Sequence, residues 1–278
     1  YYINPNSSGA RDYADQVNFG TLPHQYSSGF ITKYKVIKEN VITNLKWKSF
    51  NPQIDIKSFK AANGSELPED MELFDKNFLD TLIEVNGKNL HIITLHTVPA
   101  YHFGNKKSPN YLRNRDQLRF LEWYLTGSTD IDVKLKNISP ITNESFIAAG
   151  DWNVAHKSDN PGAIVMQRIL NKTNPWIKSQ EMSFTNEGDG YSPKPFRLML
   201  DYLVVSNDLK IKAGKIMHPN FERIELGCEK DVKDESKEDM LKIKYKKDGK
   251  SCYALIHKSY QDYKIASDHY PLFTEVEI

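Results

Sequence analysis

The alternation of apolar and polar residues along the chain predicts mostly strands, with a few helices. Two strand-like runs, 79–85 and 90–95, flank Asn86-Gly87, which is the strongest short-range signal for a β-hairpin. A strand at 146–150 ends abruptly in the polar stretch Gly150-Asp151-Trp152-Asn153. Helical spacing predicts helices at 115–125 and 163–170. Further strands are predicted at 26–32, within 36–47, at 198–205 and at 272–278.

Two long segments carry few such signals. Residues 51–77 contain Pro, Gly and acidic residues, which favours a surface connection. Residues 222–250 are dense in Glu, Lys and Asp, which favours a solvated hairpin or a charged insertion. Because no repeat, low-complexity tract or linker divides the chain, we expect 1–278 to form a single strand-dominated domain.

Charge narrows the range of partners. The 37 basic residues nearly balance the 36 acidic ones, so the net charge is +1 and no global field attracts a polyanion. Any nucleic-acid affinity must therefore come from a local patch. Lys106-Lys107, Arg113 and Arg115 could form one, and a solvated loop is the alternative interpretation.

Membrane and compartment signals are weak. No apolar run reaches the roughly 18–20 residues needed to cross a bilayer, and the start Tyr1-Tyr2-Ile3-Asn4-Pro5 lacks the features of a signal peptide. Cys228 and Cys252 lie 24 residues apart, as a disulfide or as two free thiols, and match no metal-binding pattern. The sequence does not identify the cellular compartment, and secretion or the periplasm is favoured over the cytoplasm.

Polar residues stand at or near the ends of four predicted strands. A lone histidine such as His96 is more often structural than catalytic. An acid inside an apolar strand, such as Asp201, needs a partner because an unpaired buried carboxylate is costly. Hard oxygen ligands suit a divalent cation, and a histidine oriented by an aspartate can take a proton from water near neutral pH. The candidates for such a site are His96, Asp151, Asn153, Asp201, Asp268 and His269.

Four motifs in this order resemble the endonuclease/exonuclease/phosphatase superfamily, which includes DNase I-like nucleases, sphingomyelinases and inositol phosphatases. The resemblance covers roughly residue 20 to the C-terminus and implies a four-layer α/β/β/α sandwich of the α+β class, with the site at one rim of its two sheets. The motifs are Leu95-His96-Thr97-Val98-Pro99, Gly150-Asp151-Trp152-Asn153, Leu200-Asp201-Tyr202 and Ser267-Asp268-His269-Tyr270-Pro271.

The resemblance implies a role for each of these residues. His269 is the general base and Asp201 its orienting partner. Asp151 and Asn153 hold the metal or the attacking water and the phosphate, and Asp268 joins the metal site. His96 contacts the phosphate or protonates the leaving group. The implied cation is Mg²⁺, with Mn²⁺ or Ca²⁺ as alternatives.

Two substrate contacts are also implied. Tyr26 aligns with a phosphate-contacting tyrosine, although Ser27 and Ser28 stand where the DNase-like members carry an acid that pairs with the residue equivalent to His96. Arg115 lies in the segment Asn110 to Gln117, which around 113–117 resembles an Arg/Asn segment of bacterial members.

The superfamily begins with two further strands, the second of which ends in a metal-binding Glu, and no Glu precedes Glu39 here. We therefore expect a chain lacking its N-terminal strands, a degenerate member that binds without catalysis, or an active variant with another ligand. The predicted function is a divalent-metal-dependent phosphoesterase, foremost a nuclease-type phosphodiesterase. The alternatives are a small-molecule or lipid phosphatase or phosphodiesterase, and a catalytically dead binding module.

Overall fold

The computed structural model describes residues 28–60, 66–100, 106–176, 184–188, 191–228 and 237–278. The chain divides into two compact units. The first comprises Tyr1–Ile177, Leu200–Lys212 and Val276–Ile278, and the second comprises Lys178–Met199 and Ala213–Glu275. The expectation of a single domain stays a prediction. Among the described residues no helix is both long and apolar enough to cross a membrane.

A six-stranded sheet forms the centre of the first unit, in the order β1-β2-β3-β4-β8-β5. β3 and β4 are parallel, and the other neighbouring pairs are antiparallel. The predicted hairpin is confirmed: Asn86 and Gly87 have φ of 53° and 77°, as a two-residue primed turn requires. The strands are β1 (Lys35–Ile42), β2 (Phe78–Val85), β3 (Lys88–Leu95), β4 (Phe146–Asp151), β5 (Asn174–Pro175) and β8 (Asp201–Val205).

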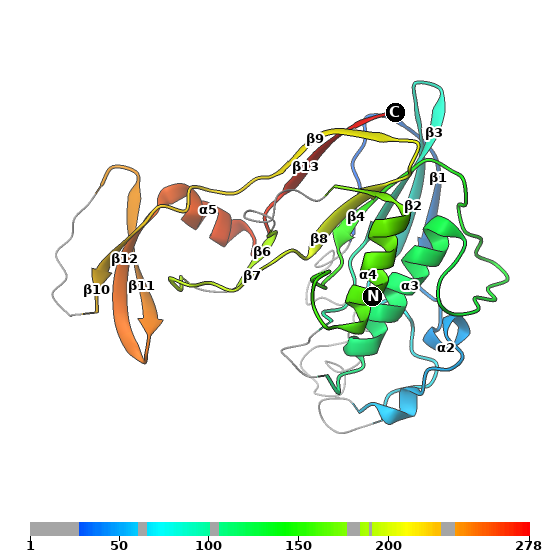
Figure 1. Ribbon diagram of the computed structural model, residues 1–278, viewed down its shortest axis with the longest axis horizontal. Helices are drawn as coiled ribbons and strands as arrows, with labels where there is room; N and C mark the ends of the chain where they lie inside the picture. The colour runs from blue at the N-terminus through cyan, green and yellow to red at the C-terminus, as the bar shows by residue number, and fades with distance from the viewer. Residues whose placement is uncertain (1–27, 61–65, 101–105, 177–183, 189–190, 229–236) are drawn as a thin grey trace. The chain divides into compact units, whose positions relative to one another are not determined.

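Two helices lie side by side in this unit, α3 (Asn110–Thr126) and α4 (Pro161–Lys172) (Figure 1). Their existence is predicted correctly, although α3 begins five residues before the predicted start. Glu122 of α3 forms an ion pair with Arg168 of α4, with Arg168 Nη2 2.8 Å from Glu122 Oε2. The Asn160 side chain caps α4 by accepting a hydrogen bond from the Gly162 amide at 2.7 Å.

The prediction of a surface connection at 51–77 is wrong. The Phe120 ring of α3 contacts the rings of Phe50, Phe74 and Phe78, with centroids 5.0–5.6 Å apart. The segment also buries a series of aliphatic side chains at irregular spacing, which no strand or helix period reveals. It contains η1 (Ile56–Ser58) and follows α2 (Trp47–Phe50).

The opposite face of the sheet is also covered. Ile83 of β2 and Val205 of β8 belong to an apolar cluster that includes Ile211 and Val276. Ile211 belongs to β9 (Lys210–Ile216) and Val276 to β13 (Leu272–Glu277). The first unit therefore has the helices on one face of the central sheet and these residues on the other. The α+β class is thus confirmed. The strand predicted at 26–32 is not formed over the described residues 28–32, which are irregular.

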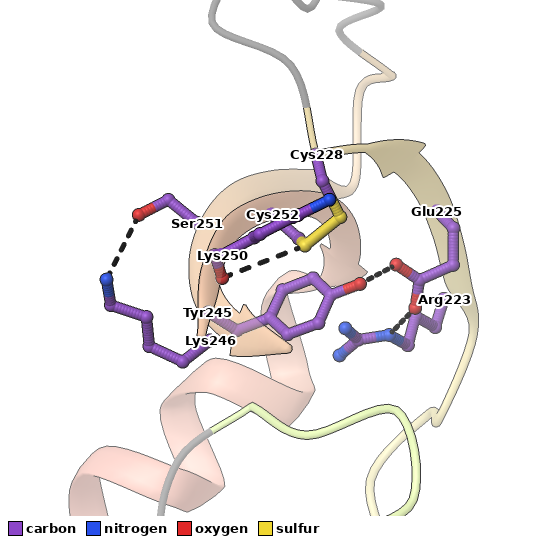
Figure 2. The surroundings of a disulfide bond; sticks show 8 residues. All are labelled: Arg223, Glu225, Cys228, Tyr245, Lys246, Lys250, Ser251 and Cys252. Carbon is purple, nitrogen blue, oxygen red and sulfur yellow. Dashed lines mark hydrogen bonds and ion pairs between the residues drawn. A yellow bond between two sulfur atoms is a disulfide. The ribbon is translucent and has the colours of Figure 1, made fainter. Parts of the chain in front are cut away.

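The second unit contains a three-stranded antiparallel sheet in the order β10-β12-β11. Cys252, in the central strand of this sheet, forms a disulfide with Cys228 (Figure 2), so the first of the two predicted alternatives holds. The charged stretch predicted at 222–250 supplies much of this sheet. The elements are β6 (Asn186–Glu187), β7 (Arg197–Leu198), β10 (Arg223–Gly227), β11 (Met240–Lys247), β12 (Lys250–His257) and α5 (Lys258–Ala266).

Candidate functional site

The parallel pairing of β3 and β4 brings two of the motifs together. Thr94 is registered with Ala149, so the chain leaves both strands at the same edge of the sheet. The Thr97 amide then donates to the Asp151 carbonyl at 3.0 Å. As a result, His96 Nε2 lies 3.3 Å from Asp151 Oδ2. The sequence prediction that these two strand ends carry neighbouring polar groups is met.

A second carboxylate faces Asp151 across the sheet. Asp201 is its direct partner in the antiparallel pairing of β4 with β8. One carboxylate oxygen of each residue lies within 4.8 Å of the other. Like charges at opposed positions destabilise a sheet. The pair therefore has the character of a functional site, where a cation or a histidine offsets the repulsion.

Asn153 turns sharply after Asp151. Its φ of 49° is left-handed, a conformation that Asn tolerates better than most residues. Its amide donates to Asp151 Oδ1 at 2.9 Å, and its side-chain nitrogen donates to Asp151 Oδ2 at 3.0 Å and to the Thr97 carbonyl at 2.9 Å. These bonds fix the side-chain nitrogen, and the role of the side-chain oxygen as a ligand stays a prediction.

Side chains of helix α3 hold the backbone segments that follow β3 and β4. Asn114 Nδ2 lies 2.8 Å from the Val98 carbonyl and 3.1 Å from the Trp152 carbonyl, so it joins both strand exits. Gln117 Oε1 accepts from the Val98 amide at 2.8 Å. Sequence reasoning did not assign these two residues a role. The only signal was their place in the stretch 113–117.

Tyr202 supports the other side of Asp151. Its hydroxyl donates to the Val154 carbonyl at 2.9 Å and accepts from the His156 amide at 3.0 Å. Burial raises the pKa of the Tyr202 phenol, so it stays protonated and holds the loop. Burial, followed by the charge of Lys157, lowers the pKa of His156, which favours a neutral imidazole. His156 was not predicted as a site residue.

The predicted basic residues of the 106–117 region have structural partners. Arg113 is fully buried, and its guanidinium donates to the carbonyls of Leu73 and Glu72 at 3.0 and 2.9 Å. Arg115 donates to Asp116 at 2.8 Å and lines a cavity of about 390 Å³. None of the other described site candidates lines that cavity. A substrate contact by Arg115 stays a prediction.

Asp268 and His269 belong to the second unit. The β6–β7 hairpin holds their backbone: the Glu187 amide donates to the Asp268 carbonyl at 3.1 Å, and the Tyr270 amide donates to the Thr185 carbonyl at 2.6 Å. His269 Nε2 lies 4.0 Å from Asp268 Oδ2. The pairing of His269 with Asp201 stays a prediction, and Tyr26 lies outside the described residues.

The donor set of the first unit fits a hard divalent cation. Two opposed carboxylates and one amide oxygen, from Asp151, Asp201 and Asn153, are the ligand types that Mg²⁺, Mn²⁺ and Ca²⁺ take in proteins. The set contains no thiolate, which argues against a zinc centre. Asp201 thus joins the predicted ligands Asp151 and Asn153 as a further candidate.

Several solved structures are similar to this chain. SmcL is 18% identical with a TM-score of 0.43, and the match covers 88% of this chain and 66% of SmcL. An endonuclease/exonuclease/phosphatase family protein from Leptotrichia buccalis C-1013-b is 13% identical with a TM-score of 0.42, over 89% of this chain and 64% of that one. A Staphylococcus aureus beta toxin variant with bound magnesium ions is 17% identical with a TM-score of 0.38, over 87% and 65%.

The chain therefore spans slightly less than two thirds of each of these proteins. One of them carries the name of the superfamily that the four motifs resemble. No protein-family model and no curated protein sequence matches the chain.

Proposed function

We propose that this protein is a divalent-metal-dependent phosphoesterase that hydrolyses a phosphodiester, as a nuclease does. The observation that carries the proposal is the opposition of Asp151 and Asp201 beside His96 at one edge of the sheet. Two facing carboxylates weaken the sheet at this edge unless a cation or a proton offsets their repulsion. A locally destabilising arrangement of charged side chains is typical of a functional site.

The candidate residues have different proposed roles in hydrolysis. Asp151, Asp201 and Asn153 would hold the cation, which when bound supplies charge neutralisation at the phosphoryl oxygens. His269, oriented by an aspartate, takes the proton from the attacking water. His96, at hydrogen-bond range of Asp151, donates to a phosphoryl or leaving-group oxygen in its protonated form. Asp268, Tyr26 and Arg115 are assigned to the metal and the substrate on the resemblance alone.

Hydrolysis of bis(p-nitrophenyl) phosphate with Mg²⁺, Mn²⁺ or Ca²⁺ tests the proposal. We expect Asp151→Ala and His269→Ala each to lower kcat by at least about 100-fold, because each removes a group that acts on the reacting atoms. Asp159→Asn is the matched control, since this exposed aspartate pairs with the exposed Lys106 and has no assigned role in hydrolysis, so the change should leave kcat unchanged.

The same assay separates the alternatives. Undiminished activity in EDTA would refute a metal-dependent reaction. Absence of both hydrolysis and Mn²⁺ binding in the wild-type protein would favour a dead binding module. Faster cleavage of p-nitrophenyl phosphate than of the diester would favour a phosphomonoesterase, and unchanged kcat in either alanine variant would overturn the site assignment.

A further inference from the structure

A cavity of about 390 Å³ is lined by helix α3, by the segment 51–59 and by residues 130–131, which follow α3 along the chain. All three parts belong to the first unit. A volume of this size is typical of sites for small molecules, which span about 300–1,000 Å³. None of the described candidates for the metal site lines the cavity, so the candidate metal site does not account for it.

Arg119, one of two arginines in the lining, is fully engaged in ion pairs. Its Nη1 lies 2.9 Å from Asp116 Oδ1, its Nε 2.7 Å from Asp130 Oδ1 and its Nη2 2.8 Å from Asp130 Oδ2. Asp130 Oδ1 also lies 3.0 Å from Arg168 Nη2 of α4. The charges of Arg119 and Asp130 therefore offset each other, and both side chains serve to hold the fold.

Arg115, the other arginine in the lining, uses only part of its guanidinium. Its Nε donates to Asp116 Oδ1 at 2.8 Å. The second oxygen of Asp116 accepts from Trp47 Nε1 at 2.7 Å and from Asn51 Nδ2 at 2.8 Å. No residue of the described chain bonds to Nη1 or Nη2 of Arg115, although this side chain is only 19% exposed. The N–H donors of these two nitrogens are therefore available to a ligand in the cavity.

Apolar side chains form another part of the wall. Ile54 and Phe59 are only 6% and 9% exposed, and Leu112 and Ile131 also line the cavity. A ligand with an apolar body would remove this surface from water, which favours binding. A small inorganic ion gains nothing from the same surface.

The charges of the lining select among anions. They sum to zero, because Arg115 and Arg119 are balanced by Asp55 and Asp130. Asp55 is exposed and repels a dianion more strongly than a monoanion. The guanidinium of arginine is planar and matches the two oxygens of a carboxylate in a bidentate contact. The cavity therefore suits a monocarboxylate with an apolar body better than a phosphate dianion.

We propose that this cavity binds a small organic monocarboxylate, with the carboxylate on Nη1 and Nη2 of Arg115 and the apolar body against Ile54, Phe59 and Ile131. The site is separate from the candidate metal site and does not depend on the proposed hydrolysis. Its ligand differs from the phosphate ester to which the resemblance assigns Arg115, and binding experiments separate the two.

A ¹H–¹⁵N NMR titration of the metal-free full chain with 3-phenylpropionate tests the proposal. We expect saturable binding with a Kd on the order of 1 mM, as is typical of so small a ligand. The neutral analogue 3-phenylpropanol and inorganic phosphate should each bind at least about tenfold more weakly, because the first lacks the carboxylate and the second lacks the apolar body.

Variants of Arg115 show whether this residue holds the carboxylate. Arg115→Gln should weaken 3-phenylpropionate binding at least about tenfold, and Arg115→Lys about fivefold, since lysine keeps the charge but not the planar fork. Arg115→Lys also carries the test if Arg115→Gln does not fold. Lys136→Gln is the matched control: it removes an exposed, solvent-screened positive charge outside the cavity and should change the Kd less than about twofold.

Asp151→Ala separates this cavity from the candidate metal site and should leave 3-phenylpropionate binding unchanged. Loss of binding in that variant would place the carboxylate at the metal site and overturn the proposal. No saturable binding by the wild type, or equal losses in Arg115→Gln and Lys136→Gln, would overturn it as well. Tighter, Arg115-dependent binding of inorganic phosphate would return Arg115 to a phosphate ester and refute the carboxylate ligand.

Discussion

At the scale of single residues, the candidate site depends on how the chain leaves β4. Gly150 has a φ of +152°, and a Cβ built there would lie 2.0 Å from the Leu95 carbonyl oxygen. That oxygen belongs to the last residue of the neighbouring strand, so it cannot yield as a flexible side chain would. Only glycine therefore lets the two strand ends approach closely enough to place His96 beside Asp151.

Gly150→Ala should destabilise the first unit by about 3 kcal/mol or more, because a backbone clash is added to an unfavourable φ. Gly87→Ala is the matched control: Gly87 also has a positive φ, of +77°, but a Cβ there meets nothing within 4 Å. It should cost about 1 kcal/mol. Urea unfolding of both variants measures the difference, and equal costs would contradict a clash at Gly150.

Residue types at strand ends made His96, Asp151 and Asn153 candidates, and the resemblance of four motifs to a known superfamily assigned them to one site. The roles of Asn114 and Gln117 could not be predicted in the same way, because they bond to backbone groups of distant segments. A carboxamide looks alike in the sequence whether it binds a ligand or a carbonyl. Only the three-dimensional path of the strand exits distinguishes these uses.

At the scale of elements, the two-residue strands β6 and β7 position the Asp268-His269 segment. Glu187 of β6 is fully buried, and its carboxylate accepts from Arg197 at 2.7 Å and from the Tyr260 hydroxyl. Burial and this hydrogen bond raise the pKa of the Tyr260 phenol, so the hydroxyl remains a donor. Lys264 donates to the backbone carbonyls of Glu187 and Gly188.

Glu187→Gln should loosen this segment, because it leaves the Arg197 guanidinium without its carboxylate. Because the Arg197 side chain is 37% exposed, the loss should cost less than the roughly 3 kcal/mol typical of a fully buried pair. Native-state hydrogen exchange should then show the Tyr270 amide, which bonds to the Thr185 carbonyl, exchanging at least about tenfold faster. Amides of the β2–β3 hairpin in the first unit provide an internal control. Unchanged exchange at Tyr270 would show that Glu187 does not hold the segment.

Long periodic elements were predictable and short ones were not. The β2–β3 hairpin, α3 and α4 carry turn, capping and periodic signals within single stretches of sequence. β6 and β7 have two residues each, so no period can be read from them. Segment 51–77 was wrongly predicted to be a surface connection because its Pro, Gly and acidic residues are typical of exposed loops. In the structure Arg113 and Gln117 donate hydrogen bonds to the Leu73 carbonyl, which lets this part of the segment be buried.

At the scale of the whole molecule, a buried ionisable cluster links strands, helix and loop of the first unit. His91 of β3 lies between two carboxylates, with Nδ1 2.8 Å from Asp80 and Nε2 2.8 Å from Glu144. The Tyr124 hydroxyl of α3 donates to Asp80 at 2.7 Å. Burial alone lowers the pKa of His91, but the hydrogen bonds to Asp80 and Glu144 outweigh it and raise the pKa above its ordinary value.

This direction fixes the pH dependence of folding. A histidine whose pKa is higher in the folded than in the unfolded state contributes stability that is fully present below the unfolded pKa, near 6.5. That contribution is lost as the pH rises through the raised pKa of the folded protein. The charged imidazole, and with it the link between β2, β3 and the loop that carries Glu144, is therefore strongest in mildly acidic solution.

His91→Gln should lower the free energy of unfolding by about 2 kcal/mol at pH 5.5, since it removes hydrogen bonds made by a charged group. The difference from wild type should shrink by pH 9, where His91 itself is neutral. Urea unfolding of both proteins across this range measures it, and groups that titrate equally in both cancel. A difference that stays constant with pH would mean that His91 stabilises the fold by packing alone. In that case the two carboxylates would hold a neutral imidazole, contrary to the direction of its pKa.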